Sequence, residues 1–578
     1  MWQQGWSAPK HAKMMTKYNK RKTGIIAGVL IFLLLAFTGL TRDEKLFEID
    51  KNLDIYYSLV RELNLFYVDE IKPDKLIRTS IDKMLGSLDP YTTYIPESEM
   101  EDFRFMTTGE YAGIGALISK HDSVVVVAEP YEGFPAQKSG LKAGDIILEV
   151  DGKNTGKMTT EQVSNLLKGP ARQTVKVRVQ RPGQRKPFEV AIVREKIQID
   201  PVPYYGMLDE KTGYIRLSNF TADCGERVKK VFLELKEQHG AGSLILDLRS
   251  NPGGLLNEAV NVANLFVPKG EEVVSTRGKV KQWDKVYKAT QTPVDTVMPI
   301  AVLVNRGSAS ASEIVAGALQ DLDRAVIVGS RTFGKGLVQT TRELSYKSSL
   351  KVTTAKYYIP SGRCIQALDY SNRNEDGSVG TVPDSLISEF TTKKGRKVYD
   401  GGGIIPDIKI DLDRLSSLSI NLINEFMYFD FATLYANAHR SIPAPGEFEI
   451  TGEMYDQFKS FVKERNFTYR SDTEEELEKL IETAKEEKYY AIAQSEFENL
   501  QEKVKHELDK DLEQFKEEAK DILTDEIVSR YYYQKGAIQA TIRTDKGIEK
   551  AKEVLSKPGE LSIVFKPGTV ISKNGKPM

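Results

Sequence analysis

The sequence has few of the residues that carry metal or histidine chemistry. Among its 578 residues there are two cysteines, Cys224 and Cys364, and five histidines. The cysteines lie far apart and match no metal-ligand spacing, and no histidine lies in an H-E-x-x-H, G-x-S-x-G or other catalytic-histidine motif. We therefore expect no metal site, no cofactor and no Ser-His-Asp triad. The simplest interpretation is two separate thiols, and the alternative is one long-range disulfide in an oxidising compartment.

The sequence also lacks a surplus of charge of either sign. Its 81 Lys and Arg residues and 82 Asp and Glu residues give a formal net charge of −1, so nothing global points to nucleic acid as a partner. Hydrophobic residues make up 40% and charged residues 28% of the chain, which is typical of a folded protein with a large core. The length predicts two to four domains.

Only one long hydrophobic run interrupts this pattern. Residues 24–40, GIIAGVLIFLLLAFTGL, carry no charge, and six Lys or Arg residues but no acid precede them. The run is at the short limit for a membrane span, and basic flanks stay in the cytoplasm. We expect a basic cytoplasmic leader at 1–23, a transmembrane or signal-anchor segment at 24–41, and a single-pass cell-membrane protein with its bulk in the periplasm. The alternatives are secretion to the periplasm after signal cleavage and a buried core helix.

Periodicity divides the rest of the chain into four regions. Residues 44–104 have apolar side chains at three- and four-residue steps, which predicts amphipathic helices that end near Asp89-Pro90. Residues 105–197 contain short β-branched runs and one helical stretch at 160–168, which predicts a small strand-rich domain.

Strands and helices alternate over residues 198–410, the third region. Three apolar runs at 243–248, 300–304 and 325–328 are typical of buried strands, and a helical stretch follows each of the first two. Such alternation predicts parallel β-α-β units.

The fourth region, residues 411–578, is helical and rich in charge. From Leu500 to Ile522 apolar residues recur every three or four positions, which predicts one long amphipathic helix. This helix either packs on its own domain or forms a homo-oligomer, and the pattern favours neither interpretation.

Small residues cluster after the second buried strand. The segment 305–313, NRGSASASE, places three serines between that strand and a helix. The N-terminus of a helix has a positive field that favours developing negative charge. On its own, however, a serine at this position is more often a helix cap.

A lysine motif follows the third buried strand. The segment 333–339, FGKGLVQ, puts Lys335 between two glycines, and a lysine in a dry site loses its charge readily and can act as a base. One βα unit joins this segment to 305–313, so both should lie at the same end of the parallel sheet. The turn NPGG at 251–254 also follows a strand, and its N–H groups could form an oxyanion hole.

These motifs resemble those of the C-terminal processing peptidases, also called tail-specific proteases, over residues 44–410. The resemblance implies an α/β fold with a crotonase/Clp-protease-like catalytic core at 198–410, an inserted or preceding PDZ domain, and N-terminal and C-terminal helical regions. It also implies that Ser310 is the nucleophile, Lys335 the general base and Gln339 a support for the lysine.

The same resemblance implies an oxyanion hole made of two backbone N–H groups. One belongs to Ala311, the residue after the nucleophile. The other belongs to Gly253 or Gly254 of the NPGG turn, and the sequence does not choose between these two glycines.

Residues 105–197 resemble the PDZ domain of this family. The segment YAGIGA at 111–116 lies where a carboxylate-binding loop belongs, and SGLKAGD at 139–145 adds specificity. PDZ domains add an extended peptide to a sheet edge and bind its terminal carboxylate with backbone N–H groups. The resemblance implies a peptide-binding site, with an apolar pocket for the last side chain, formed by Tyr111, Gly113, Ile114, Gly115, Val163 and Leu167.

The expected function is that of an extracytoplasmic serine endopeptidase that binds protein or peptide substrates with free C-termini and cleaves them with a Ser-Lys dyad. One alternative is a non-catalytic PDZ scaffold on a protease fold, but Ser310, Lys335 and Gln339 are all present. A PDZ-bearing Ser-His-Asp protease is a second alternative, and the lack of a histidine motif argues against it.

Overall fold

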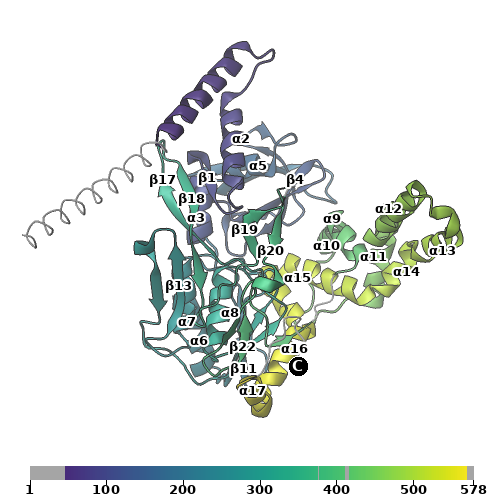
Figure 1. Cartoon of the computed structure of the whole chain (residues 1–578). Helices are drawn as coiled ribbons and strands as arrows, with labels where there is room; N and C mark the ends of the chain where they lie inside the picture. The colour runs from purple at the N-terminus through teal and green to yellow at the C-terminus, as the bar shows by residue number, and fades with distance from the viewer. Residues whose placement is uncertain (1–45, 375–376, 411–414, 569–578) are drawn as a thin grey trace, which may run out of the picture. The chain divides into compact units, whose positions relative to one another are not determined.

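The computed structural model describes residues 46–374, 377–410 and 415–568. The chain forms two compact units that divide between Ser87 and Leu88 (Figure 1). The predicted leader at 1–23 and the predicted hydrophobic span at 24–41 lie outside the described residues.

Within the described ranges, no helix is both long enough and apolar enough to cross a bilayer. The helix α15 (Lys516–Thr541) has 26 residues, but Lys, Glu, Asp and Arg side chains occur along its length, and charges of this kind are costly in a bilayer. The prediction of a single-pass membrane protein is corrected by this finding. The alternative prediction, secretion to the periplasm, stays a prediction.

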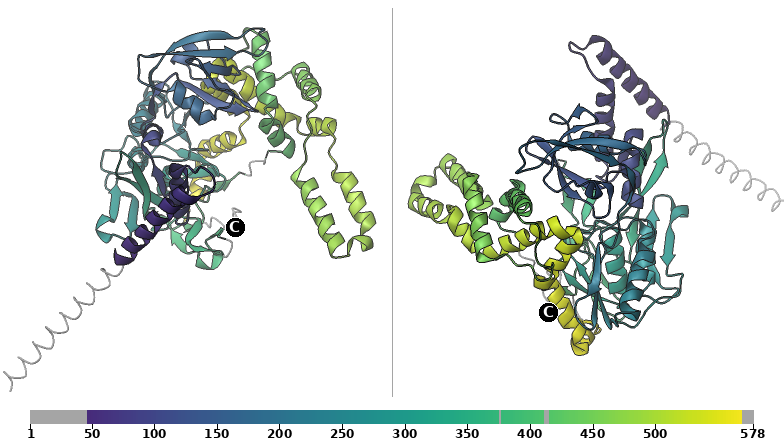
Figure 2. Two further views of the ribbon diagram at one scale, coloured as in Figure 1. Left: turned by 90° about the horizontal axis from the view of Figure 1, so that it is seen from above. Right: turned by 180° about the vertical axis from the view of Figure 1, so that it is seen from behind.

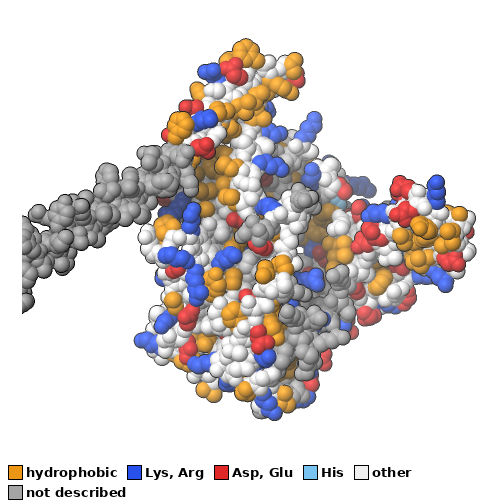
Figure 3. All heavy atoms as spheres, in the orientation of Figure 1, with side chains coloured by type: hydrophobic (Ala, Val, Ile, Leu, Met, Phe, Trp, Pro, Cys, Tyr) orange, Lys and Arg blue, Asp and Glu red, His pale blue; other side chains and the backbone are white. Residues whose placement is uncertain are grey.

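Two helices make up the described part of the first unit. The first covers residues 46–66, and α2 (Pro73–Gly86) begins at a proline, whose missing N–H would have no partner there. The Tyr56 hydroxyl lies 2.5 Å from Ser80 Oγ and joins the two helices. Hydrophobic side chains remain exposed along this pair (Figure 3), as Tyr57 at 70% shows.

The second unit contains an antiparallel sheet in the order β3-β4-β5-β7-β8. Val175, Val177 and Val179 of β7 are fully buried and alternate with more exposed residues, as predicted for a half-buried strand. A capping box of Thr159 and Gln162 begins the predicted helix, α5. The elements are β2 (Glu110–Gly113), β3 (Ala116–His121), β4 (Val124–Pro130), α4 (Pro135–Lys138), β5 (Ile146–Val150), β6 (Lys153–Asn154), α5 (Thr160–Leu167), β7 (Thr174–Gln180), β8 (Phe188–Val193) and β9 (Glu195–Gln198), where β6 pairs with β5 and β2 with β9.

A six-stranded sheet in the order β10-β11-β12-β15-β16-β23 follows. All neighbouring pairs are parallel except β10 with β11, as the strand–helix alternation predicts. The three predicted strands are β12, β15 and β16. The elements are β10 (Tyr204–Met207), β11 (Thr212–Arg216), α6 (Cys224–Glu237), β12 (Ser243–Asp247), α7 (Leu256–Asn264), β15 (Ile300–Val304), α8 (Ala311–Asp321), β16 (Val326–Gly329) and β23 (Ile408–Lys409).

Helices cover both faces of this sheet, and they come from different regions of the sequence. On one face, Leu246 and Val302 pack with residues of α6, α7 and α8. On the other face, Ile245 and Leu303 pack with Ile548 and other apolar residues of α16 (Lys546–Ser556). The last part of the chain therefore completes the core that residues 198–410 begin.

A second, antiparallel sheet has the order β1-β18-β13-β14, and β17 also pairs with β18. Its strand β17 begins directly after the FGKG segment, so the chain passes from that segment into this sheet. The strands are β1 (Thr93–Ile95), β13 (Glu272–Gly278), β14 (Lys285–Lys288), β17 (Leu337–Glu343) and β18 (Ser349–Tyr358).

The C-terminal region is helical, as predicted, but the long helix predicted from Leu500 to Ile522 is divided. The chain has extended φ and ψ at Glu507 and non-helical values at Phe515, so three helices occupy this stretch. Leu512 and Ala519 are buried in the core of their own helical region. The helices are α9 (Ser417–Asn424), α10 (Met427–Ala438), α11 (Gly452–Glu464), α12 (Asp472–Glu486), α13 (Gln494–Val504), α14 (Leu508–Gln514), α15, α16 and α17 (Pro558–Val564), with α12 and α13 side by side (Figure 2).

Candidate active site

All catalytic and oxyanion residues predicted from the sequence line one cavity of the second unit. Its volume is about 650 Å³, and β17, β18, the segment before β2 and the turns after β12 and β15 contribute to its wall. Most of the remaining lining is apolar, from side chains such as Phe105, Leu256 and Ile314. The predicted residues at this cavity are Gly253, Gly254, Ser310, Ala311, Lys335 and Gln339.

Ser310 lies at the N-terminus of α8 in a strained backbone conformation. Its φ of 55° and ψ of −112° fall outside the regions that L-residues ordinarily adopt. Such strain persists only where the surroundings enforce it, and it is concentrated at functional sites. The residue is also placed where the positive field of the helix N-terminus is strongest.

A buried carboxylate connects the backbones of Ser310 and Lys335. Glu313 is fully buried, and its Oε2 accepts hydrogen bonds from the N–H groups of Ser310 at 2.8 Å and of Lys335 at 2.9 Å. Its Oε1 accepts from the Thr332 hydroxyl at 2.6 Å and from Gly334 N–H at 2.7 Å. Burial raises the pKa of this carboxyl to about 7, although the four hydrogen bonds oppose the rise.

A buried tyrosine makes the complementary connection through the carbonyl groups. The Tyr357 hydroxyl donates to the carbonyl oxygen of Lys335 at 2.6 Å and lies 3.1 Å from that of Ser310. Glu313 therefore holds the N–H groups, and Tyr357 the carbonyl groups, of the same two residues.

Lys335 is half-buried, and its environment favours the neutral amine. Burial lowers its pKa to about 8, the charge of Lys351 acts in the same direction, and Glu313 and Asp89 oppose the change. The Nζ atom lies 4.3 Å from the centre of the Tyr91 ring. No carboxylate forms an ion pair with Lys335 among the described residues, so a lysine of this kind can accept a proton near neutral pH.

Gln339 contacts a neighbouring strand in this structure. Its Nε2 donates to Thr353 Oγ1 at 3.1 Å, and Thr353 is its partner in the β17–β18 pairing. This bond fixes the side chain at the edge of the cavity and leaves its Oε1 for another partner.

The two glycines of the NPGG turn differ in the state of their N–H groups. The N–H of Gly253 donates to Asn251 Oδ1 at 2.9 Å, whereas that of Gly254 has no hydrogen-bond partner within the described part of the chain. Gly253 has a φ of 102°, and a Cβ there would lie 2.8 Å from Ser310 Cβ and 2.9 Å from Ala311 N. The turn is therefore in direct contact with the backbone at Ser310, and only glycine fits at position 253.

The predicted peptide-binding residues lie on β2, on α5 and in the loop between β2 and β3, and several of them are core residues. Ile114, Val163 and Leu167 are buried in its hydrophobic core. The Tyr111 ring lies so close to Gly113 that a Cβ on this glycine would be 2.7 Å from a ring carbon. Gly115 has a φ of 73°, which a loop of this shape requires.

Tyr111 lies directly beside the predicted carboxylate-binding loop. Burial raises the pKa of its hydroxyl, and the backbone N–H groups of Ala116 and Gly115 oppose the rise.

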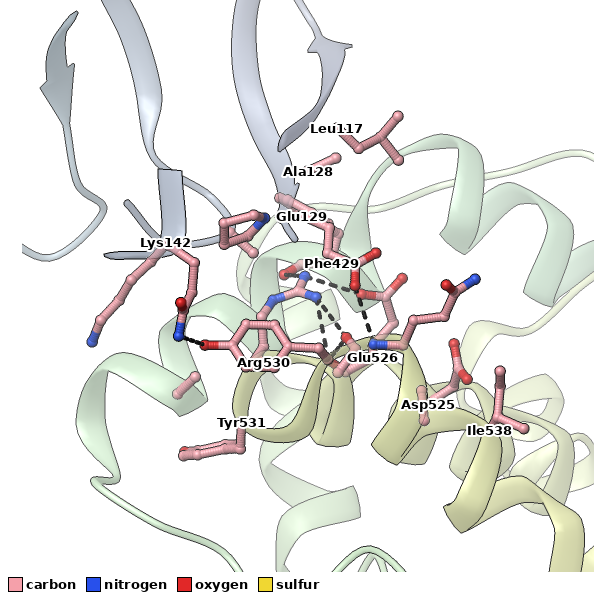
Figure 4. A pocket seen from close by; sticks show the side chains of 18 of the residues that line it. Leu117, Ala128, Glu129, Lys142, Phe429, Asp525, Glu526, Arg530, Tyr531 and Ile538 are labelled. Carbon is pink, nitrogen blue, oxygen red and sulfur yellow. Dashed lines mark hydrogen bonds and ion pairs between the residues drawn. The ribbon is translucent and has the colours of Figure 1, made fainter. Parts of the chain in front are cut away.

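A second cavity of about 1190 Å³ borders the first. Its wall comes from the PDZ-like sheet, the six-stranded sheet and the C-terminal helices, and Ser218, Asn219 and Pro252 line both cavities. Figure 4 shows Arg530 at its wall, paired with Glu526 at 3.0 Å. Gln534 N–H donates to Glu129 Oε1 at 3.1 Å, which links α15 to β4.

Sequence reasoning missed four residues of the catalytic cavity or its support. Glu313 ends the NRGSASASE motif, and Tyr91 directly follows the predicted turn at Asp89-Pro90, so both lie in or beside segments that the sequence marks. Tyr357 and Lys351 lie on β18, where no short motif marks them. Strand register brings them to the site, and register between distant strands is not a local signal.

Comparisons with known proteins identify three regions of the chain. Residues 211–372 match the peptidase family S41, residues 126–181 match a PDZ domain, and residues 418–555 match the C-terminal helical domain of probable PDZ-proteases. These three matches correspond to the six-stranded core, the PDZ-like sheet and the C-terminal helices.

Individual relatives are similar over most of their length. A carboxy-terminal-processing protease of Bartonella bacilliformis is 36% identical over 61% of this chain and 78% of the relative. A probable CtpA-like serine protease of Staphylococcus aureus is 33% identical over 79% of this chain and 88% of the relative. The solved structure of a photosystem II D1 C-terminal processing protease is 31% identical and covers 62% of this chain and 92% of that one, with a TM-score of 0.34.

Proposed function

Because the chain belongs to peptidase family S41 and is a serine-type protease with a PDZ domain, we propose that Ser310 is its nucleophile and Lys335 its general base. The observation that supports this proposal is the shared cavity, in which a strained serine at a helix N-terminus and a half-buried lysine without a carboxylate partner are fixed by the same glutamate.

Acylation in this proposal begins with a proton transfer. Neutral Lys335 takes the proton of the Ser310 hydroxyl as Oγ attacks the scissile carbonyl carbon. The resulting oxyanion is stabilised by the N–H of Ala311 and by that of Gly254, whose hydrogen is without a partner in the free enzyme. The protonated Lys335 then donates its proton to the leaving amine, and an acyl-enzyme remains.

Deacylation repeats these steps with water in place of the serine. Lys335, neutral again, removes a proton from the water that attacks the ester, and Ser310 leaves with that proton. Gln339 supports the lysine through its free Oε1, since its Nε2 is fixed by Thr353. Loss of cleavage in Ser310→Ala at an unchanged melting temperature tests the nucleophile, and persistent cleavage would contradict it.

We further propose that the PDZ domain selects substrates by their free C-terminus. The loop at residues 113–116 would bind the terminal carboxylate through backbone N–H groups, and the peptide would extend along the free edge of β3, which pairs only with β4. Ile114, Val163 and Leu167 would contact the last side chain once a peptide opens the packing between α5 and β3. Tyr111 would give up its place beside the loop.

Amidation of the substrate tests this selection. Removing the terminal charge should slow cleavage sharply if the loop reads it, with the effect in KM. Equal kcat/KM for the free and amidated forms of one peptide would contradict C-terminal recognition, while leaving the Ser310–Lys335 proposal intact.

A further inference from the structure

One lysine of the catalytic cavity is not used by the proposed mechanism. Lys351 lines the cavity from β18, where it is paired in register with Thr341 of β17 and Thr93 of β1. Tyr357 of the same strand also lines the cavity. The pairing on both sides fixes the position of Lys351 in the wall.

Lys351 is a partly desolvated cation without an acidic partner. It is half-buried, burial lowers its pKa, and no carboxylate or hydrogen-bond acceptor contacts its Nζ among the described residues. Lys347, in the same hairpin, instead pairs with Glu97 at 2.8 Å. Burying a charge without a counter-ion is unfavourable, so an anion that enters the cavity gains an interaction there.

We propose that Lys351 is a carboxylate-binding subsite of the catalytic cavity. The polypeptide bound across Ser310 would place an acidic side chain or its own terminal carboxylate on Lys351, and Thr341, which lines the same wall, is close enough in register to share that group. The subsite defines a substrate preference of the protease and rests on the proposed function.

Because the charge of Lys351 helps to lower the pKa of Lys335, a charged substrate at Lys351 should also affect the general base. The groups that act on Lys335 are Lys351, Glu313, Asp89 and the ring of Tyr91. A carboxylate on Lys351 cancels the charge that helps to keep Lys335 neutral. Substrates with a carboxylate at this subsite should therefore bind more tightly but reach half-maximal kcat at a higher pH than their amide analogues.

The test uses the full chain and one apolar parent peptide that it cleaves. Glu and Gln are placed in turn at each of the three positions on either side of the scissile bond, and each peptide is made with a free and with an amidated C-terminus. At one position, or for the free C-terminus, the carboxylate form should have a KM about 10-fold lower, as expected of a charge-assisted hydrogen bond. Lys351→Met should abolish that difference, and Lys356→Met, which removes an exposed lysine of the same strand, should preserve it.

The outcomes distinguish a side-chain carboxylate from the terminal carboxylate of the substrate. They also distinguish a failure of the Lys351 subsite from a failure of the proposed function. A preference for Glu over Gln identifies a side-chain carboxylate as the group that Lys351 binds. A preference for the free C-terminus that disappears in Lys351→Met identifies the terminal carboxylate. A preference for the free C-terminus that the PDZ domain creates would survive this substitution. The subsite would be overturned if no carboxylate preference of the wild type, for a side chain or for the chain end, is lost in Lys351→Met. Cleavage by Ser310→Ala would instead overturn the proposed function.

Discussion

Within the described part of the chain, the carboxylate buried at the N-terminal end of α8 forms no ion pair, whereas Asp321 and Asp323 at its C-terminal end each pair with an arginine. Glu313, at the first end, is held by the N–H groups of Ser310, Gly334 and Lys335 and by one hydroxyl. No ion pair involves Glu313 among the described residues. The pKa of Glu313 moves up and that of Lys335 moves down, so both approach neutral pH.

The C-terminal end of α8 lies in a network of buried ion pairs. Arg363 pairs with Asp321 at 2.8 Å, and Arg396 pairs with Asp323 at 2.6 Å and with Asp407 at 2.5 Å. The Arg396 side chain is fully buried. Here each charge has its counter-charge, and the arrangement fixes the end of α8 against the chain that returns to β23.

The difference shows how one helix serves two purposes. A network in which each charge has a counter-charge holds the helix in position, whereas a buried centre without an ion pair can change its protonation where catalysis needs it. Each prediction below removes one element of this contrast.

The largest effect should follow the loss of the base itself. Lys335→Ala is expected to reduce kcat/KM by about 10⁴-fold or more, because nucleophile and base act as a unit. The melting temperature should stay within a few degrees, since the side chain is only half-buried. Lys335→Arg should be equally inactive because a guanidinium does not deprotonate in proteins, and an active arginine variant would contradict the role of Lys335 as a base.

The next largest effect concerns stability at the opposite end of the helix. Arg396→Ala leaves Asp323 and Asp407 buried without a cation, and the free energy of unfolding should fall by about 3–5 kcal/mol in denaturant titrations. Arg470→Ala is the matched control, because its pair with Glu478 is exposed and is worth about 0–1 kcal/mol. Similar losses for both variants would show that the network at the end of α8 is not special.

Glu313→Gln should act on both activity and pH dependence. An amide offers one acceptor oxygen, so two of the four hydrogen bonds are lost, and small displacements of reacting groups can lower kcat by about 10²-fold. Glu518→Gln, which alters a carboxylate that accepts from Ser416 far from the cavity, should leave kcat unchanged. Equal activity of both variants would contradict a positioning role for Glu313.

The raised pKa of Glu313 determines how the free energy of unfolding should change with pH. The folded protein holds this proton more tightly than the unfolded chain between pH 4.5 and about 7. Its contribution to stability is therefore present below pH 4.5 and is lost as the pH rises through about 7. Relative to Glu313→Gln, the wild type should lose ~3 kcal/mol of unfolding free energy across this window, and a constant difference would contradict the burial effect.

The smallest effect is expected from a change of pH in the wild-type protein. Lys335 must be neutral to accept a proton, and its pKa is lowered to about 8. The value of kcat should therefore rise about tenfold for each pH unit below pH 8 and level off above it. Initial rates at saturating peptide from pH 6 to 10 measure this profile, and a plateau that begins below pH 6 would exclude lysine as the base.

Much of the catalytic cavity was predictable from sequence because topology fixes it. Motifs that follow β12, β15 and β16 meet at the carboxyl end of one parallel sheet, and a chain with this alternation has few other arrangements. For that reason the sequence could predict that Ser310 and Lys335 lie at one cavity. Tyr357 could not be predicted there, because it reaches the cavity through the pairing of β18 with β17 and β13, and such pairing leaves no local pattern.

Two other features of the structure could not be predicted from the sequence, for different reasons. The helix predicted from Leu500 to Ile522 has continuous apolar periodicity, but His506 pairs with Asp511 and lies against Tyr469, and these tertiary contacts override propensity. The PDZ residues Val163 and Leu167 were placed by analogy with a peptide-bound groove. In the free protein the same apolar side chains complete the core.

The position of α16 has a consequence for the order in which the protein can mature. β16 ends at Gly329, whereas the helix that covers the second face of its sheet ends at Ser556. At about 5–20 residues per second on the ribosome, tens of seconds separate the synthesis of these two elements. A nascent chain that already contains Ser310 and Lys335 would thus still lack the helix that covers one face of its sheet, so proteolytic competence should arise only after α16 has been synthesised.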